Sequence, residues 1–395
     1  MIATLALAAT VAKAPIVVPD QTSNLVVVQA HVARPPMRDG RLLGAWYVIG
    51  DTLLKGAEGY SELTLMSYGS QAGIQPSVVT FPDHMRIEFV APEGGLDLAM
   101  ELMTAVLKRP RLRDRDVIDA IARFETQKPK PLAAAGYQYQ GRYSRLSSPY
   151  VKNVYNRAFT PETVQFVFGG KVSKEEANQA MEDWVARWRP DPSTRIPMRE
   201  SLAPITGVGG EVSVYALRGK PFRLDEPGAV PKLLATYALG VGKGASCFRV
   251  LRQKNAWSYQ QGAYLWPSIE GFVPVVYMLQ SSNRGDGALV AEMRAELLKD
   301  IESWDEATFA RAVSVASSSE HLAQAPTAFL SSPSSGMGRT VRDRCALQGY
   351  LSLTGSGQAR LETVLGAMQN VDLDQLQTAA KSMVEDASGT WIPGN

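Results

Sequence analysis

The two halves of the chain repeat one order of hydrophobic and polar positions. Residues 85–90 alternate between apolar and polar positions as a β-strand does, and residues 275–279 form a second, apolar strand. Each strand is followed by glycines and then by a segment with apolar residues three or four positions apart, which predicts an amphipathic helix. The apolar positions of these helices are Leu96, Met100, Met103 and Leu107 in the first half and Leu289, Met293, Leu297 and Ile301 in the second.

A second helix is predicted after each of these. Asp114 or Asp116 is expected to cap the one in the first half, and Asp305 the one in the second, because aspartate satisfies the free N–H groups at a helix start. The matching order indicates an internal duplication. The side chains expected in the core are Val117, Ile118, Ile121 and Phe124 in the first half and Phe309, Ala312 and Val313 in the second.

Two further helices and a strand complete the pattern. Residues 163–170 are typical of a strand that ends in two glycines, and Ser173 is placed to cap the helix after it. Another amphipathic helix is predicted near the C-terminus. The apolar faces are Ala177, Met181, Trp184 and Trp188 in the first helix and Leu373, Leu376, Ala380 and Met383 in the second, and both are interpreted as core.

A stretch rich in proline and glycine separates the two halves. Residues 189–210 contain four prolines and three glycines and show little periodicity, which is typical of a linker. We therefore assign residues 1–190 to an N-terminal domain, 191–210 to the linker and 211–395 to a C-terminal domain. Each domain is expected to be a mostly antiparallel sheet with helices packed on one face, so the predicted class is α+β with two tandem homologous domains.

The composition excludes several classes of function. The 395 residues are enough for two domains, and 45% are hydrophobic, so the chain can bury a full core. There are 41 basic and 39 acidic side chains without a basic run, which disfavours a nucleic-acid partner. No segment reaches the roughly 18 apolar residues of a membrane-spanning helix, so none is expected.

The histidines and cysteines are too few and too dispersed for a self-contained zinc site. His31, His84 and His321 lie far apart, and none has a second ligand one helical turn away. Cys247 and Cys345 do not have metal-binding spacing. They are interpreted as buried free thiols, with a disulfide between them as the alternative.

The first residues allow two interpretations. Residues 2–12 are apolar and small, and Ala12-Lys13-Ala14 has the form of a signal-peptidase site, which favours an exported, periplasmic protein. No Lys or Arg precedes the apolar segment, however. The alternative is a cytoplasmic protein in which this segment runs into a first β-strand through residues 16–18.

Three stretches occur in an order found in one family of peptidases. Residues 44–56, GAWYVIGDTLLKG, stand where that family has G-x-x-H-x-x-E-H-x-x-x-K-G. Residues 159–170, from Phe-Thr-Pro to Gly-Gly, are similar to the last strand of its first domain. Residues 239–254 carry a glycine-rich turn and Leu-Arg-Gln-Lys, with Tyr259 seven residues after Arg252. Together they resemble the pitrilysin/insulinase family of zinc peptidases over nearly the whole chain.

The zinc motif is where the chain departs from this family. Tyr47 and Asp51 stand in place of the two histidines, and Gly50 stands in place of the catalytic glutamate. Glu125 falls near the position of the third ligand. Zinc needs the two imidazoles, and hydrolysis needs the carboxylate base, so no metal and no catalytic residue are expected in this chain. A stray cation between Asp51 and Glu125 is the remaining alternative.

The resemblance implies a substrate-binding role for Arg252 and Tyr259. In the family an Arg-Tyr pair at this spacing grips the peptide and stabilises the oxyanion, although Asn255-Ala256-Trp257 replaces the usual residues between them. Without the surrounding motif, the pair would be interpreted as an ordinary helix and strand packing at a domain edge. The glycine-rich turn, residues 240–244, fits neither phosphate-loop pattern. It is similar to a longer glycine segment in the non-catalytic subunit of mitochondrial processing peptidase.

The resemblance therefore implies an inactive subunit of a two-subunit zinc peptidase. Its partner would be a homologous chain that bears the H-x-x-E-H motif and supplies the zinc, and the two would enclose an unfolded peptide. Two alternatives come from other classes. One is a structural subunit similar to the core proteins of the respiratory cytochrome complex, and the other is a stand-alone peptide-binding protein or homodimer.

Overall fold

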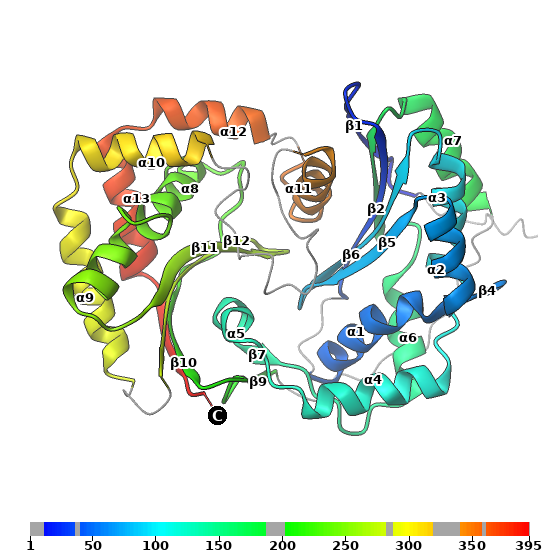
Figure 1. Ribbon diagram of the computed structural model, residues 1–395, viewed down its shortest axis with the longest axis horizontal. Coiled ribbons are helices and arrows are strands. Elements are labelled where there is room, and N and C mark those ends of the chain that lie inside the picture. The colour runs from blue at the N-terminus through cyan, green and yellow to red at the C-terminus, as the bar shows by residue number, and fades with distance from the viewer. Residues whose placement is uncertain are drawn as a thin grey trace, which may run out of the picture.

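The chain folds into two halves, each built on one sheet (Figure 1). The computed structural model describes residues 12–35, 40–186, 202–281, 287–318, 340–357 and 361–394. Most of the signal-like segment and of the predicted linker, as well as Trp188 and His321, lie outside these residues.

The first sheet has five strands in the order β1-β8-β2-β6-β5. All neighbouring strands are antiparallel except β1 and β8, which pair in parallel from Ile16 opposite Val167. The predicted strands at 16–18, 85–90 and 163–170 are all present. The bounds are β1 Ile16–Pro19, β2 Leu25–Ala33, β5 Gln75–Thr80, β6 His84–Pro92 and β8 Val164–Gly170.

Helices of the first half cover one face of this sheet. Alternate strand residues, such as Val28, Ile87 and Phe166, are fully buried beneath them. A short hairpin and a second two-stranded pair, formed by segments far apart in the sequence, flank the helices. These elements are α1 Gly40–Thr52, η1 Leu53–Lys55, β3 Gly56–Ala57, β4 Tyr60–Ser61, α2 Glu62–Gln71, α3 Leu96–Lys108, α4 Asp114–Thr126, α6 Ser148–Ala158, α7 Lys174–Ala186, and the β7–β9 pair Tyr139–Gln140 and Ala203–Pro204.

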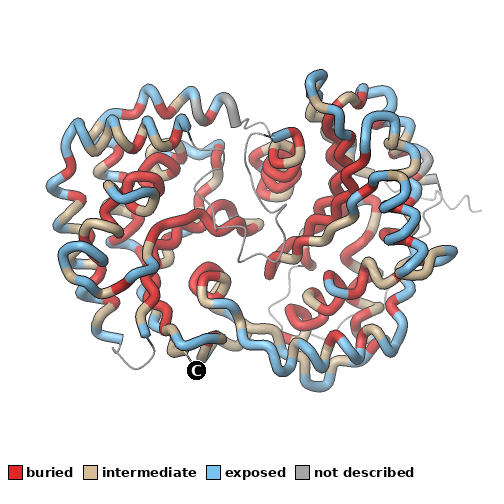
Figure 2. The backbone as a smooth tube through the Cα atoms, in the orientation of Figure 1, coloured by how far each residue is buried: buried red, intermediate tan, exposed pale blue. Residues whose placement is uncertain are grey.

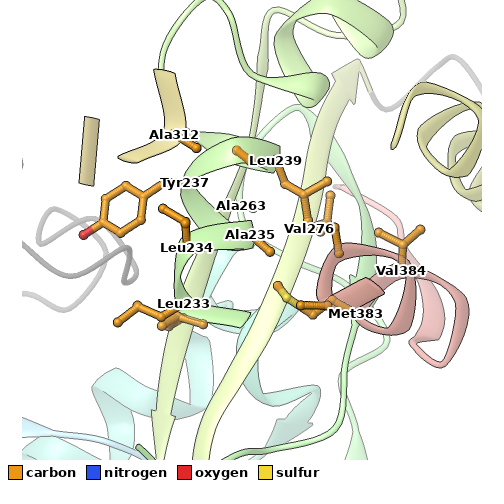
Figure 3. Close-up of a cluster of buried hydrophobic side chains, with 14 of the residues drawn as sticks. Leu233, Leu234, Ala235, Tyr237, Leu239, Ala263, Val276, Ala312, Met383 and Val384 are labelled. Atoms are coloured by element: carbon orange, nitrogen blue, oxygen red, sulfur yellow. The ribbon is translucent and has the colours of Figure 1, made fainter. Parts of the chain in front are cut away.

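The second sheet has four antiparallel strands in the order β11-β12-β10-β13. Helix α8 lies across it, and Leu234, Ala235 and Leu239 pack against Ala263 and Val276 of the strands (Figure 3). The bounds are β10 Val212–Arg218, α8 Ala229–Gly240, the π-helix η2 Cys247–Lys254, β11 Gln260–Ser268, β12 Gly271–Ser281, α9 Leu289–Glu302, α10 Glu306–Ser318, α12 Leu361–Ala367, η4 Met368–Asn370, α13 Leu373–Glu385 and β13 Ser388–Ile392.

One helix of each half packs against the sheet of the other half. Helix α5, Pro131–Tyr137, belongs to the first half in sequence but packs on the free face of the second sheet, where Leu132 and Ala135 join Val214 and Trp266 in one cluster. Helix α11, Val341–Leu353, comes from the second half and packs on β1, β2 and β8 of the first sheet. We call α5 and α11 the exchanged helices. Figure 2 shows that most of α11 is buried.

The two exchanged helices dock through different chemistry. Helix α5 presents alanine and leucine side chains, whereas α11 brings Arg342 to Glu88, whose side chain is fully buried. Arg342 Nε donates to the Glu88 carboxylate at 2.7 Å, and Gln29 Nε2 donates to it at 2.5 Å. Although burial opposes ionisation, Arg86 and Arg342 hold the pKa of Glu88 below its usual value. The contact with α11 therefore combines a buried ion pair with the apolar packing of Val341 and Cys345 on the strands.

Most of the predicted helices and their core residues are confirmed. Asp305 and Ser173 cap the helices that follow them, through Thr308 N–H and Glu176 N–H respectively. Two predictions for α4, Asp114–Thr126, are wrong. Ile118 is 60% exposed, because it lies on the solvent side of the helix, and Asp114 is its first helical residue, with Arg113 at the cap position.

The two cysteines are free thiols, as the sequence predicted. Cys247 and Cys345 are both buried and unbonded, and burial raises the pKa of each thiol. Among the described segments, no helix has the length and apolar character needed to cross a membrane.

Candidate functional site

The altered zinc motif lies on the last two turns of α1. Tyr47, Gly50 and Asp51 are three and four residues apart and therefore share one face of the helix. This helix packs against α4, α6 and the edge strand β5. Residues of α4 and β5 therefore determine whether a metal ion could bind at the altered motif.

Asp51 is neutralised by an arginine. Its carboxylate forms an ion pair with Arg123 of α4. The sequence pointed to Glu125 as the carboxylate opposite the motif, but Glu125 is exposed two residues further along, and Arg123 takes the place beside Asp51. A guanidinium at this point repels a metal cation, so the arrangement does not suit one.

Tyr47 belongs to a group of aromatic rings. Its ring centroid lies 6.1 Å from that of Phe124, and Phe124 stacks on Tyr143 at 5.2 Å with an angle of 9° between the planes. Burial raises the pKa of the Tyr47 phenol well above its usual value, and Tyr143, Tyr137 and Asp83 raise it further. The phenol is therefore neutral at physiological pH and is not an anionic ligand.

Gly50 leaves no room for the catalytic glutamate of the family. A Cβ atom built on Gly50 would lie 2.0 Å from Thr80 Oγ1 and 3.2 Å from Met85 Cε. The helix can approach β5 this closely only because residue 50 has no side chain. Within the described ranges there is no group of three or more His, Cys, Asp or Glu side chains that could hold a metal. The residues at the motif do not fit zinc.

Arg252 and Tyr259 are brought together in the second half. The guanidinium carbon of Arg252, on η2, lies 5.2 Å from the centre of the Tyr259 ring. Tyr259 is 86% exposed, the highest value among the large hydrophobic side chains of the described residues. Both side chains are on the surface, so their contact does not arise from burial in a core.

The three cations of η2 differ in their partners. Arg249 pairs with Asp300 at 2.7 Å, and Lys254 pairs with Glu296. Arg252, between them in sequence, has no hydrogen bond or ion pair from its side chain within the part of the chain that the structure describes; its contacts there are with aromatic rings. Because Arg252 is also exposed, we expect its five N–H donors to be available to a carbonyl or carboxylate acceptor.

The backbone around Tyr259 is fixed by its neighbours. Ser258 is buried, and its hydroxyl donates to the Leu279 carbonyl at 2.5 Å and accepts from Gln260 N–H at 3.1 Å. The turn before it is closed by Trp257 N–H, which donates to the Leu251 carbonyl at 2.8 Å. The exposed phenol thus projects from an anchored backbone.

The glycine-rich turn follows helix α8 and precedes η2, as its sequence indicated. Ala245 N–H donates to the Gly242 carbonyl at 3.2 Å, and Arg249 donates to the Gly244 carbonyl. Because the turn follows a helix, it lacks the strand that precedes a phosphate loop.

Two residues of these sites were not identified from the sequence. One is Arg123, whose opposite charge faces Asp51 across two helices 72 positions apart. The other is Phe248, whose ring lies 5.2 Å from the guanidinium of Arg252. Phe248 precedes Arg252 by four residues on one helix, and this spacing is the sequence signal that could have predicted their contact.

Comparison with known proteins identifies the fold. Residues 145–315, from near the start of α6 into α10, match the family model described as peptidase M16 inactive domain. The M16 peptidases are the pitrilysin group. Over this segment the chain resembles the pitrilysin group. The matched residues cover less than half of the chain and include Arg252 and Tyr259.

Solved structures extend the pitrilysin-like fold over the remainder. The chain is similar to a peptidase M16 inactive domain from Pseudomonas fluorescens, with a TM-score of 0.74 and 13% identity over 96% of this chain and 94% of that one. It is also similar to a protease from Helicobacter pylori, with a TM-score of 0.75 and 14% identity over 97% and 98%. No curated protein matches the chain. The predicted family resemblance and α+β class are confirmed by the matched segment and by the shared fold.

Proposed function

We propose that this chain is the substrate-binding, non-catalytic subunit of a two-subunit M16 zinc peptidase. It pairs with a homologous chain that carries the H-x-x-E-H motif and the zinc, and the two enclose an unfolded peptide. In this assembly Arg252 and Tyr259 contact the peptide, while the hydrolytic centre belongs to the partner.

The observation that carries this proposal is the uncommitted guanidinium of Arg252 beside the exposed Tyr259 phenol. A cationic side chain on a protein surface commonly pairs with a nearby carboxylate, as Arg249 and Lys254 do on the same helix. Within the described ranges, Arg252 instead contacts rings, and no acceptor there takes its donors. A site with free fixed donors and a phenol suits a ligand that is rich in carbonyl oxygens, as an extended peptide is.

Each side chain has a separate role in the proposed complex. The guanidinium can donate two parallel hydrogen bonds to peptide carbonyls, which orients the chain. The Tyr259 hydroxyl can donate to the oxyanion that develops when the scissile carbonyl becomes tetrahedral. The first interaction exists before the reaction, so it contributes to KM, whereas the second strengthens in the transition state and contributes to kcat.

The test is a fluorogenic-peptide assay of this chain co-expressed with the H-x-x-E-H homologue of its host. Tyr259→Phe removes one oxyanion donor and is expected to lower kcat about a hundredfold. Tyr68→Phe is the matched control, since Tyr68 is also an exposed tyrosine, 45% accessible, on helix α2 of the other half. It should leave kcat unchanged.

Two results would contradict the proposal in different ways. If the partner cleaves equally well alone, this chain is a structural subunit, as the core proteins of the cytochrome complex are. If the chain binds the labelled peptide without any partner, by fluorescence anisotropy, and the pair does not cleave it, the stand-alone peptide-binding function replaces the proposed one.

A further inference from the structure

Arg252 contacts a second aromatic ring that the Arg-Tyr motif does not include. Phe248 precedes it by four residues on the π-helix η2, and the guanidinium carbon lies 5.2 Å from the centre of each ring, that of Phe248 and that of Tyr259. We call these three residues the two-ring contact. A cation over an aromatic face is attracted by the negative charge density of the ring.

The two rings differ in how firmly they are held. Tyr259 is 86% exposed, so solvent surrounds most of its side chain. Phe248 is only partly exposed and follows Cys247, which is buried, on the helix that also carries Arg252. Phe248 is therefore the more rigid of the two surfaces, and it belongs to the same element as the cation.

Arg252 needs such a surface because the described residues provide no other contact that fixes its side chain. Its side chain has many rotamers, and among the described residues it has neither a carboxylate nor a carbonyl partner that would select one of them. An arginine paired with a protein acceptor would be fixed but would have fewer donors left for a ligand. An aromatic ring contacts the flat face of the guanidinium and so restricts its orientation. The N–H groups lie in the plane of the guanidinium and remain available to a ligand.

We propose that Phe248 is a positioning residue that holds the guanidinium of Arg252 ready to bind peptide carbonyls. This proposal rests on the proposed function and adds a residue to that site. Phe248 does not touch the peptide. It acts by reducing the freedom that Arg252 would otherwise lose on binding, which is the general effect of preorganisation on affinity.

The first experiment examines the isolated chain and does not depend on any partner. NMR spectra of the chain with isotope-labelled arginine are recorded for the unmodified protein and for Phe248→Leu, Phe248→Tyr and Arg252→Gln, the last of which assigns the signal. The Arg252 side-chain signals should show a ring-current shift that decreases by about half in Phe248→Leu and is retained in Phe248→Tyr. A shift that does not change in Phe248→Leu would overturn the proposal.

The second experiment measures kinetics in the co-expressed complex. Phe248→Leu is expected to raise KM about two- to fivefold, which corresponds to the loss of one cation–π contact at an exposed site, with kcat unchanged. Phe248→Tyr keeps an aromatic ring at this position, so its KM should equal that of the unmodified protein. Phe309→Leu, at another partly buried ring packed against the core of the same half, is the control and should have no effect.

A double-mutant cycle separates positioning from general damage. Once Arg252→Gln has removed the cation, Phe248→Leu should cause no further rise in KM, because its effect passes through Arg252. Additive effects would overturn the positioning role. If Arg252→Gln itself leaves KM unchanged, the proposed substrate role of Arg252 fails, and the NMR result alone then decides whether Phe248 holds the guanidinium.

Discussion

The face of α1 that carries the altered zinc motif and the surface of η2 differ in how their polar groups are used. On α1, Asp51 is paired with Arg123, Tyr47 lies among aromatic rings, and Gly50 is closed against Thr80. On η2, Arg252 has no charged partner among the described residues and Tyr259 is almost fully exposed. One region is internally satisfied, and the other has donors that face outward.

Under the proposed function, this difference distinguishes the region that binds a ligand from the region that does not. A site that no longer binds anything can be filled by packing and ion pairing at little cost, and α1 shows both. A site that must bind a ligand has to keep unpaired groups and forgo the stability they could add. Substitutions on α1 should therefore alter the free energy of unfolding, and those on η2 should alter cleavage.

The largest expected effect is on stability at Gly50. Gly50→Glu forces a side chain into Thr80 and buries a charge, so the free energy of unfolding should fall by at least about 3 kcal/mol in a urea titration. Gly287→Glu is the control, since nothing lies within 4 Å of a Cβ built there. If Gly50→Glu is as stable as the control, the face of α1 is open and the closed-site interpretation is wrong.

The next effect is on activity and tests η2. Arg252→Gln should lower kcat/KM of the co-expressed complex about tenfold, the loss of a charge-assisted hydrogen bond, while the free energy of unfolding changes by less than about 0.5 kcal/mol. The comparison of the two regions would not hold if this substitution destabilised the fold instead. The control is Lys254→Gln, whose cation already has Glu296 as a partner.

A smaller effect concerns Tyr47 at high pH. Because its pKa is raised in the folded state, the unfolded chain loses this proton first, and the free energy of unfolding should decrease as pH rises above 10. Tyr47→Phe removes this proton, so the decrease should be smaller by up to about 1.4 kcal/mol per pH unit. Equal slopes between pH 9 and 11 would show that the phenol is hydrated in the folded protein.

The smallest effect is expected at Arg123. Its pair with Asp51 is partly exposed, with 54% of the Arg123 side chain accessible, so Arg123→Gln should reduce the free energy of unfolding by about 0.2–1 kcal/mol. Thermal unfolding would measure the loss. Dialysis of the variant against zinc, followed by elemental analysis, should show no stoichiometric metal, since Asp51 remains a single carboxylate. Stoichiometric zinc would show that Arg123 alone prevents binding.

The sequence predicted the local elements well and the contacts between the halves poorly. Helical patterns identify α3, α9 and α13, because each buries one face within its own half. The period-two pattern identifies β6, although this strand is buried on both faces. Ile118 was misplaced because four apolar residues on α4 are more than its narrow buried face accommodates. Helix α11 is buried on nearly all sides, so it has no apolar stripe for a periodicity argument to find.

The same distinction applies to the candidate site. The spacing of Arg252 and Tyr259 could be read from the motif, since both lie on one short stretch of chain. The exposure of Tyr259, the free donors of Arg252 and the contact with Phe248 depend on side-chain placement. The closure of Gly50 depends on β5, thirty residues away, and no local pattern reports such a distance.

The exchanged helices have a consequence for the integrity of the molecule. Helix α5 fills the core of the second half, and α11 bonds to the first sheet through Arg342 and Glu88. The two halves should therefore remain associated through α5 and α11 when the peptide chain between them is cut. A chain cleaved once in residues 187–201 would still migrate as one particle under native conditions and separate only in denaturant. Covalent continuity between the halves is thus secondary, and it is the interlocking of the two cores that makes the chain a single body.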